Sequence, residues 1–250
     1  MNWRGWLRPL RLFFAPTPGL QLAADAIPTP WTPGRIAIYE RISACQLQSD
    51  GSLPDPTFAL PGEAPLADTV WDGAADYSQP YPLGALERAQ SHDVSTALRR
   101  AADDHAAPRL ATMYQVLAVA NAAIGEDVLA RLNKSGADPA RMALLARWLA
   151  RKAPDAIAVK FAIAVLGCYG AASDADLLMT LGLHEEFTLL CAIALCKLLG
   201  PEQSQTAMWN LARRVHGWGR IHVVRKLADT QCPEIRQWLL RDGDKNTRVN

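Results

Sequence analysis

Apolar positions recur at helical spacing from about residue 83 onward, in successive runs of roughly ten to seventeen residues. Most runs end near Gly, Pro or a polar pair, and several begin with Asp, Ser or Glu, which suits the positive end of a helix dipole. In one run, Asp138 is a candidate N-cap and Pro139 occupies the first turn. The pattern predicts helices at 83–105, 108–136 (split in two at Gly125), 138–154, 155–170, 173–183, 185–200, 201–215, 219–229 and 233–243.

One apolar helix of this series is written nearly twice. The segment "FAIAVLGCYG" (161–170) reappears thirty residues later as "CAIALCKLLG" (191–200), and a looser third copy starts near "IHVVRKLAD". A unit of about thirty residues with two helices and two turns is typical of an α-solenoid, because stacked helix pairs bury a continuous core. We therefore expect these two helices to be equivalent members of successive pairs, with Ile163 and Ile193 both buried.

Residues 108–243 resemble HEAT-like helical repeats. The resemblance rests on "AIAVLGCYGAASDADLL", "AIALCKLLGPEQSQTAM" and "VVRKLADTQCPEIRQWLL", in each of which an apolar helix ends and an acidic or Pro-Glu start opens the next. The chain is also similar to uncharacterised bacterial HEAT-like proteins that pair "PWTPGRIAIYERI" with "GWGRIHVVRKL", which implies no particular activity. The implied fold class is all-α: a right-handed α-solenoid of HEAT-like helix pairs over 85–243, with a flexible tail at 244–250.

Residues 1–84 differ in composition from the helical region. Most of the chain's 17 prolines lie here, and because Pro fixes φ and lacks an N–H donor, long regular elements are excluded. One short helix fits at 34–46, with Ile36 and Ile42 on its buried face. The segment also carries aromatic residues that disordered tails usually lack. We expect it to be Pro-rich, mostly irregular and packed against the helical body.

The first residues, "MNWRGWLRPLRLFF", combine Arg with large apolar side chains. Three Arg and Pro9 interrupt the apolar run that a secretory signal needs. Two interpretations stay open: the aromatic side chains dock on the domain, or the segment lies in a membrane interface. No apolar run approaches the roughly 20 residues of a transmembrane segment. The five cysteines form no C-x-x-C pair, so a reducing, cytoplasmic location is expected.

Charge is unevenly distributed along a chain whose net charge is only +1. Residues 50–127 carry twelve Asp or Glu against four Arg, a local net of −8, whereas residues 210–250 carry nine Lys or Arg against four acids, a local net of +5. Such asymmetry can orient a charged partner. The alternative is an ordinary solvated surface, and the sequence leaves both open.

The sequence carries no catalytic or metal-binding signature. It contains no H-E-x-x-H, G-x-S-x-G, G-x-x-x-x-G-K-S/T or G-x-G-x-x-G pattern. The clusters "DDH" (103–105) and "DAD" (174–176) are interpreted as caps at helix ends. "HGWGR" (216–220) is interpreted as a tight turn whose Trp218 packs into the next helix pair, with an exposed contact patch as the alternative. No cofactor and no metal are expected.

The loop "WDGAADYSQPYPLG" (71–84) presents aromatic side chains beside acids. This combination suits a basic or peptide partner, and an anchoring of the rings against the helices explains it equally well. The candidate partner-binding residues are Trp71, Asp72, Asp76, Tyr77 and Tyr81 of this loop, together with Trp209, Arg213, Trp218 and Arg220 of the basic half.

These observations favour a non-enzymatic, protein-binding helical-repeat module, because solenoids bind macromolecules through broad curved surfaces. A bacterial immunity-type inhibitor of a toxin and an adaptor for a secreted effector are the candidates within this class. The alternative is a HEAT-like nucleic-acid-binding protein related to DNA glycosylases of alkylation repair. There, Trp209 or Trp218 would stack on a base. Its phosphate contacts would be Arg213, Arg214, Arg220, Arg225, Lys226 and Arg236.

Overall fold

The computed structural model describes residues 27–62 and 84–246. These residues form helices and, within the described ranges, no strand, which confirms the predicted all-α class. The α-helices are α1 (Ile38–Ser43), α2 (Ala85–Asp103), α3 (Ala107–Ala118), α4 (Gly125–Lys134), α5 (Pro139–Lys152), α6 (Ala156–Tyr169), α7 (Ala175–Leu181), α8 (Glu185–Leu198), α9 (Pro201–Ala212), α10 (Gly217–Leu227) and α11 (Pro233–Asp242). Short 3-10 helices, η4 (Ala122–Ile124) and η5 (Ala172–Asp174), precede α4 and α7.

Local signals account for where these helices start and stop. The Asp138 carboxylate accepts a hydrogen bond from the Arg141 N–H (3.0 Å), and Pro139 follows as the first helical residue of α5. Both features satisfy or remove backbone donors that a helix start leaves without partners. Each predicted helix of the region is present, and 108–136 is divided into α3 and α4 as expected.

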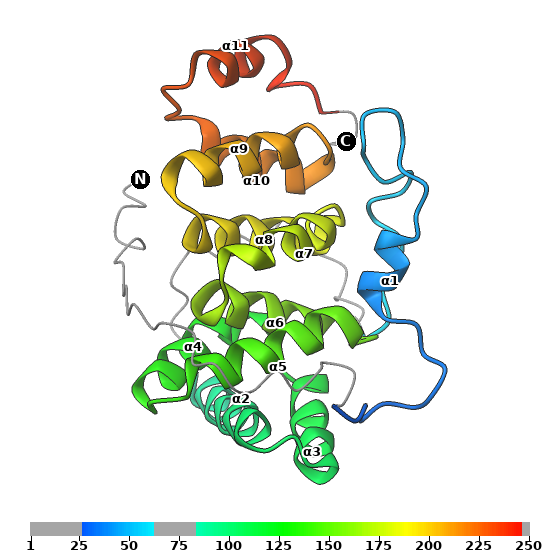
Figure 1. Cartoon of the computed structure of the whole chain (residues 1–250), viewed down its shortest axis with the longest axis vertical. Helices are drawn as coiled ribbons and strands as arrows, with labels where there is room; N and C mark the ends of the chain where they lie inside the picture. The colour runs from blue at the N-terminus through cyan, green and yellow to red at the C-terminus, as the bar shows by residue number, and fades with distance from the viewer. Residues whose placement is uncertain (1–26, 63–83, 247–250) are drawn as a thin grey trace.

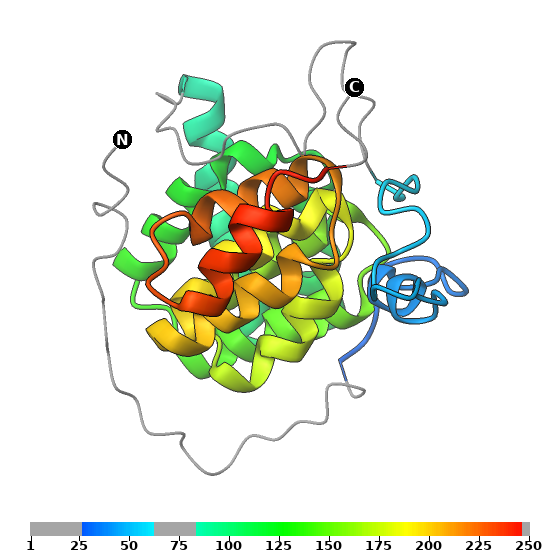
Figure 2. The same ribbon diagram turned by 90° about the horizontal axis from the view of Figure 1, so that it is seen from above.

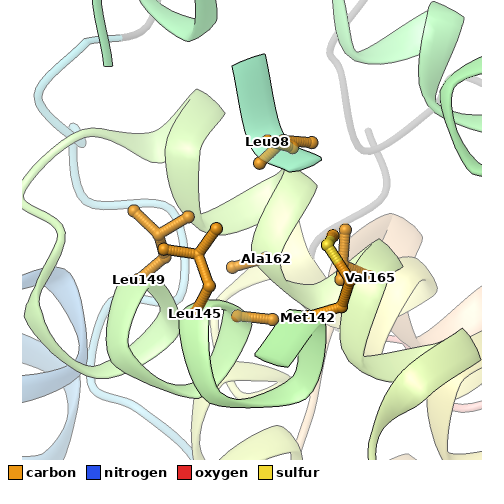
Figure 3. A pocket seen from close by; sticks show the side chains of 7 residues that line it. Leu98, Met142, Leu145, Leu149, Ala162 and Val165 are labelled. Carbon is orange, nitrogen blue, oxygen red and sulfur yellow. The ribbon is translucent and has the colours of Figure 1, made fainter. Parts of the chain in front are cut away.

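Helices α2 to α11, here called the stack, follow one another along the long axis of the molecule (Figure 1). The helix α6 packs between α5 and α8, and α8 packs in turn against α10. The shorter α7 lies on α8, and α9 lies on α10 and α8. One continuous apolar core runs through these layers. A small apolar gap between α2, α5 and α6 is too small for a water molecule, so it belongs to this core (Figure 3).

The helices α6 and α8 correspond at an offset of 29 residues, although their letters match best at thirty. Both have fourteen residues, and they begin at Ala156 and Glu185. All seven buried positions of α8 fall on buried positions of α6 at this offset. The expectation that Ile163 and Ile193 are both buried is therefore half wrong. Ile163 is fully buried, but Ile193 is only partly buried, since its counterpart at 29 is the half-exposed Ala164.

Small residues set the close spacing of successive helices in the stack. A Cβ atom added to Gly167 of α6 would lie 3.1 Å from the Ala194 Cα of α8. A Cβ atom on Gly219 of α10 would lie 2.7 Å from the Thr188 hydroxyl oxygen of α8. Larger residues at these two glycines would force the helices apart.

Residues 27–62, here called the strap, run along one side of the stack (Figures 1 and 2). The strap is irregular apart from α1 and buries apolar side chains in the common core, as expected. The predicted helix at 34–46 is too long, and Ile36 is not on its buried face. Ile36 is 60% exposed because Ala37 is extended and the Ile38 N–H donates to the Ala153 carbonyl of the stack (3.1 Å), so α1 starts only at Ile38.

Candidate functional site

The strap is fastened to the N-terminal ends of two successive helices of the stack. The Ala156 N–H at the start of α6 donates to the Pro61 carbonyl (2.9 Å). The Glu185 N–H at the start of α8 donates to the Pro56 carbonyl, also at 2.9 Å. Helix starts leave backbone donors without partners, so strap carbonyls act here as caps. The strap is thus part of the folded domain.

Asp155, the residue before α6, is the centre of a polar clasp between strap and stack. Its carboxylate accepts two hydrogen bonds from the Arg35 guanidinium (2.8 and 2.5 Å) and one from the Tyr114 hydroxyl (2.5 Å). Burial alone would raise the pKa of Asp155, but these hydrogen bonds outweigh it and hold that pKa below its ordinary value. The Trp31 ring stacks on Trp148 beside the clasp. All these groups are mutually satisfied, so the clasp is structural.

His184 caps α8 from within the core. Its Nδ1 atom accepts the Glu186 N–H (3.3 Å), and its Nε2 atom lies 2.9 Å from the Phe58 carbonyl of the strap. A carbonyl only accepts, so Nε2 carries the proton and the ring is neutral. Burial lowers the pKa of His184 to about 4. This histidine joins strap and stack and is shielded from any ligand.

A cavity of about 540 Å³ opens near the C-terminal end of the stack, where α9, α10, α11 and the strap meet. Its lining is dominated by cations, and we call it the basic cavity. The lining residues are Asp50, Arg213, Arg214, His216, Arg220, Trp238, Asp242 and Lys245. Two of the partner-binding residues predicted from the sequence, Arg213 and Arg220, are therefore brought together here.

Arg220 lies inside the fold, and its placement differs from that expected of a surface contact. Only 6% of it is exposed. Its guanidinium donates to the Ala212 carbonyl at the end of α9 and to the Asp242 carbonyl at the end of α11, and it packs over the Trp238 ring. Burial lowers the pKa of Arg220, yet an arginine remains charged under ordinary conditions. Arg220 therefore ties α9, α10 and α11 together.

Trp209, Arg213 and Trp218 are nearer the surface. The exposed Arg213 guanidinium lies 4.7 Å from the Trp209 ring, a cation–π contact that presents both side chains together. Trp218 was expected to pack into the next helix pair. Instead it lies in the first turn of α10 with 37% of its surface exposed. The remaining candidates, Trp71, Asp72, Asp76, Tyr77 and Tyr81, lie outside the described residues.

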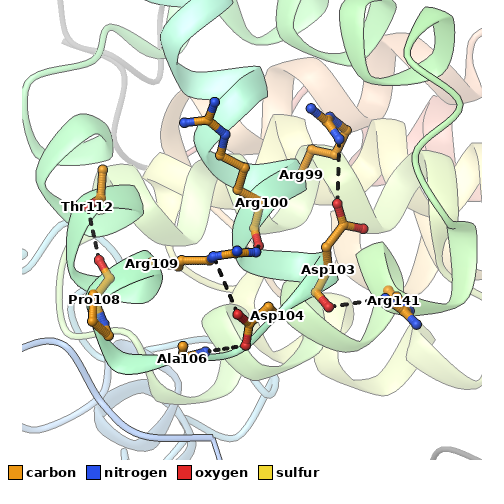
Figure 4. A network of polar contacts seen from close by, with 9 residues as sticks. All are labelled: Arg99, Arg100, Asp103, Asp104, Ala106, Pro108, Arg109, Thr112 and Arg141. Carbon is orange, nitrogen blue, oxygen red and sulfur yellow. Dashed lines mark hydrogen bonds and ion pairs between the residues drawn. The ribbon is translucent and has the colours of Figure 1, made fainter.

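The acidic clusters act as turn and cap residues. The Asp104 carboxylate accepts the Ala106 N–H (3.1 Å) and faces Arg109, while Arg141 bonds the Asp103 carbonyl (Figure 4). Asp174 is held by two hydrogen bonds from Arg147. Within residues 27–62 and 84–246, no group of three His, Cys, Asp or Glu side chains could hold a metal ion. No helix in these ranges has the length and apolarity to cross a membrane.

Searches of protein-family models, curated proteins and solved structures find no match to the chain.

Proposed function

We propose that the protein is a non-enzymatic, protein-binding module whose stack is a right-handed α-solenoid of HEAT-like helix pairs. The observation that carries the proposal is the 29-residue offset. The helices α6, α8 and α10 end at Tyr169, Leu198 and Leu227, so each ends 29 residues after the one before. The second helices follow the same spacing, since η5 begins at Ala172 and α9 begins at Pro201. Repeats of this kind build long surfaces that suit macromolecular partners.

The surface around Trp209 and Arg213 is the best-placed contact region of the described chain. Trp and Arg are the residue types that most often dominate protein interfaces. Here the two side chains stack on each other beside the basic cavity, and Trp218 is exposed on the neighbouring α10. An acidic patch on a partner would complement this basic end. A cytoplasmic, bacterial inhibitor of a toxin and an adaptor for a secreted effector are both consistent with such a surface.

Nucleic-acid binding is the second candidate, favoured by the gathering of Arg213, Arg214 and Lys245 around one cavity. One feature weighs against it. The buried Arg220 guanidinium is committed to two backbone carbonyls, so it is not available to follow a phosphate backbone along the surface. A protein partner needs only local complementarity and tolerates this arrangement.

A mobility-shift titration of duplex DNA over a salt series tests the choice between the two. We expect no complex at micromolar protein and physiological salt. Binding at micromolar protein or below that weakens steeply with salt, and that is lost when Arg213 and Arg214 are changed to Glu, would establish the nucleic-acid function in its place. Arg225→Glu is the matched control, because Arg225 is exposed on α10 outside the cavity lining.

A further inference from the structure

The basic cavity has an excess of positive charge that the described residues do not balance. Four cations line it, Arg213, Arg214, Arg220 and Lys245, against the carboxylates of Asp50 and Asp242. With His216 neutral, the formal sum is +2. Its volume of about 540 Å³ lies within the roughly 300–1,000 Å³ of ordinary ligand sites. The cavity is thus large enough for a small molecule and has the charge to favour an anion.

Arg220 gives the cavity a second and independent indication. This guanidinium is more than nine-tenths buried, and its two terminal nitrogens are bonded only to carbonyl oxygens. Its Nε atom is buried without a hydrogen-bond partner, and no described carboxylate lies within ion-pair distance of it. Buried charges are normally compensated by an opposite charge. An anion in the cavity that Arg220 lines would supply that compensation through the local field.

The outer cations remain able to touch a ligand directly. Arg214 donates through Nε to the Gly51 carbonyl (3.0 Å), and among the described residues none bonds its two terminal nitrogens. Arg213 bonds Asn210 through one terminal nitrogen and is exposed. Lys245 forms an ion pair with Asp242 (2.8 Å), which partly offsets its charge. Asp50 is occupied by the Ser52 N–H (2.8 Å) and faces His216 at 3.7 Å.

We propose that the basic cavity is a binding site for a phosphate group, either free phosphate or the phosphomonoester of a small molecule. The cations come from the end of α9, from α10 and from the segment after α11, so they approach from several elements. A phosphate presents oxygens in several directions, whereas a carboxylate presents two in one plane. Guanidinium groups bind phosphate oxygens through charge-assisted hydrogen bonds. This site is independent of the protein-binding function proposed above.

Isothermal titration calorimetry of the full chain in a chloride buffer of constant ionic strength tests the site. Inorganic phosphate and phenyl phosphate are the two probes. We expect saturable binding of one phosphate per chain. Tighter binding of phenyl phosphate would identify a small phosphorylated molecule as the occupant, and equal or weaker binding would identify free phosphate.

Three variants locate the binding. Arg214→Gln should weaken it at least tenfold. Arg213→Gln, which touches neither strap nor core, should weaken it as well, and this variant serves if Arg214→Gln loses its helical circular dichroism. Arg225→Gln should leave binding unchanged. The absence of saturable binding, or an equal loss in Arg225→Gln, would overturn the site. A DNA complex that phosphate displaces from the same arginines would assign the cavity to a nucleic-acid backbone, and would also overturn it.

Discussion

At the scale of single residues, a buried histidine couples the strap to the stack. His184 can accept the Glu186 N–H only while its Nδ1 atom is unprotonated, and its Nε2 proton is given to the Phe58 carbonyl. Protonation would cost the first bond and place a charge in the core. The lowered pKa of about 4 is the result. The same geometry makes the stability of the fold depend on pH.

We predict that the protein loses roughly 3 kcal/mol of unfolding free energy as pH falls from about 6.5 to about 4. In this window the unfolded chain binds a proton on His184 and the folded chain does not, so acid favours unfolding. The contribution is fully present above pH 6.5. Urea unfolding at a series of pH values measures it. His184→Asn should flatten the curve between pH 6.5 and 4, whereas His92→Asn, on an exposed site of α2, should not. Equal slopes in wild type and His184→Asn would contradict the assignment.

At the scale of helices, packing is determined by the 29-residue register and by close approach at glycine. The register places Ile163 in the core and leaves Ile193 partly exposed. The approach of α10 to α8 depends on Gly219, whose missing side chain makes room for Thr188. Each feature leads to a paired mutational comparison.

Truncating the two isoleucines should give unequal losses. Ile163→Ala removes a fully buried side chain and should cost about 2–5 kcal/mol. Ile193→Ala should cost clearly less, because part of this side chain already meets solvent. Chemical denaturation of both variants measures the difference. Equal losses would mean that the two helices correspond at thirty residues.

Adding one methyl group should separate two glycines. Gly219→Ala should destabilise the fold by roughly 1–3 kcal/mol, because the new Cβ atom meets Thr188 at 2.7 Å. Gly125→Ala is the control, since Gly125 has helical backbone angles and open space around its Cβ position. It should be neutral or slightly stabilising. Thermal melts in which both variants match wild type would show that α10 does not depend on this close contact.

The sequence predicts the helices well because their limits depend on neighbouring residues such as Asp138 and Pro139. It predicts the register of α6 and α8 less well. Identical letters at thirty residues suggest one alignment, but burial follows the rotation of each helix against its neighbours. The basic cavity is out of reach of local patterns, because Arg214 and Gly51 meet across 163 positions of the chain. A local net charge of +5 over 210–250 was the one signal of it.

At the scale of the whole molecule, the strap spans several layers of the stack. It meets the end of α5 at Ala153, the starts of α6 and α8 at Ala156 and Glu185, and the end of α9 at Arg214. These contacts hold the strap as part of one domain with a continuous core. The stack is thereby covered along one side, and the Trp209–Arg213 pair lies at its basic end. A partner that uses this end would meet exposed Trp and Arg side chains in a fixed arrangement.

Affinity capture from the cells that make this protein, after nuclease treatment, tests the protein-binding function most directly. The bait is the full chain, compared with a Trp209→Ala, Arg213→Glu double variant and an Arg225→Glu control. We predict that one protein is captured in stoichiometric amount by wild type and by the control, survives the nuclease, and is lost with the double variant. Capture that disappears with nuclease, or that the double variant retains in full, would contradict the account.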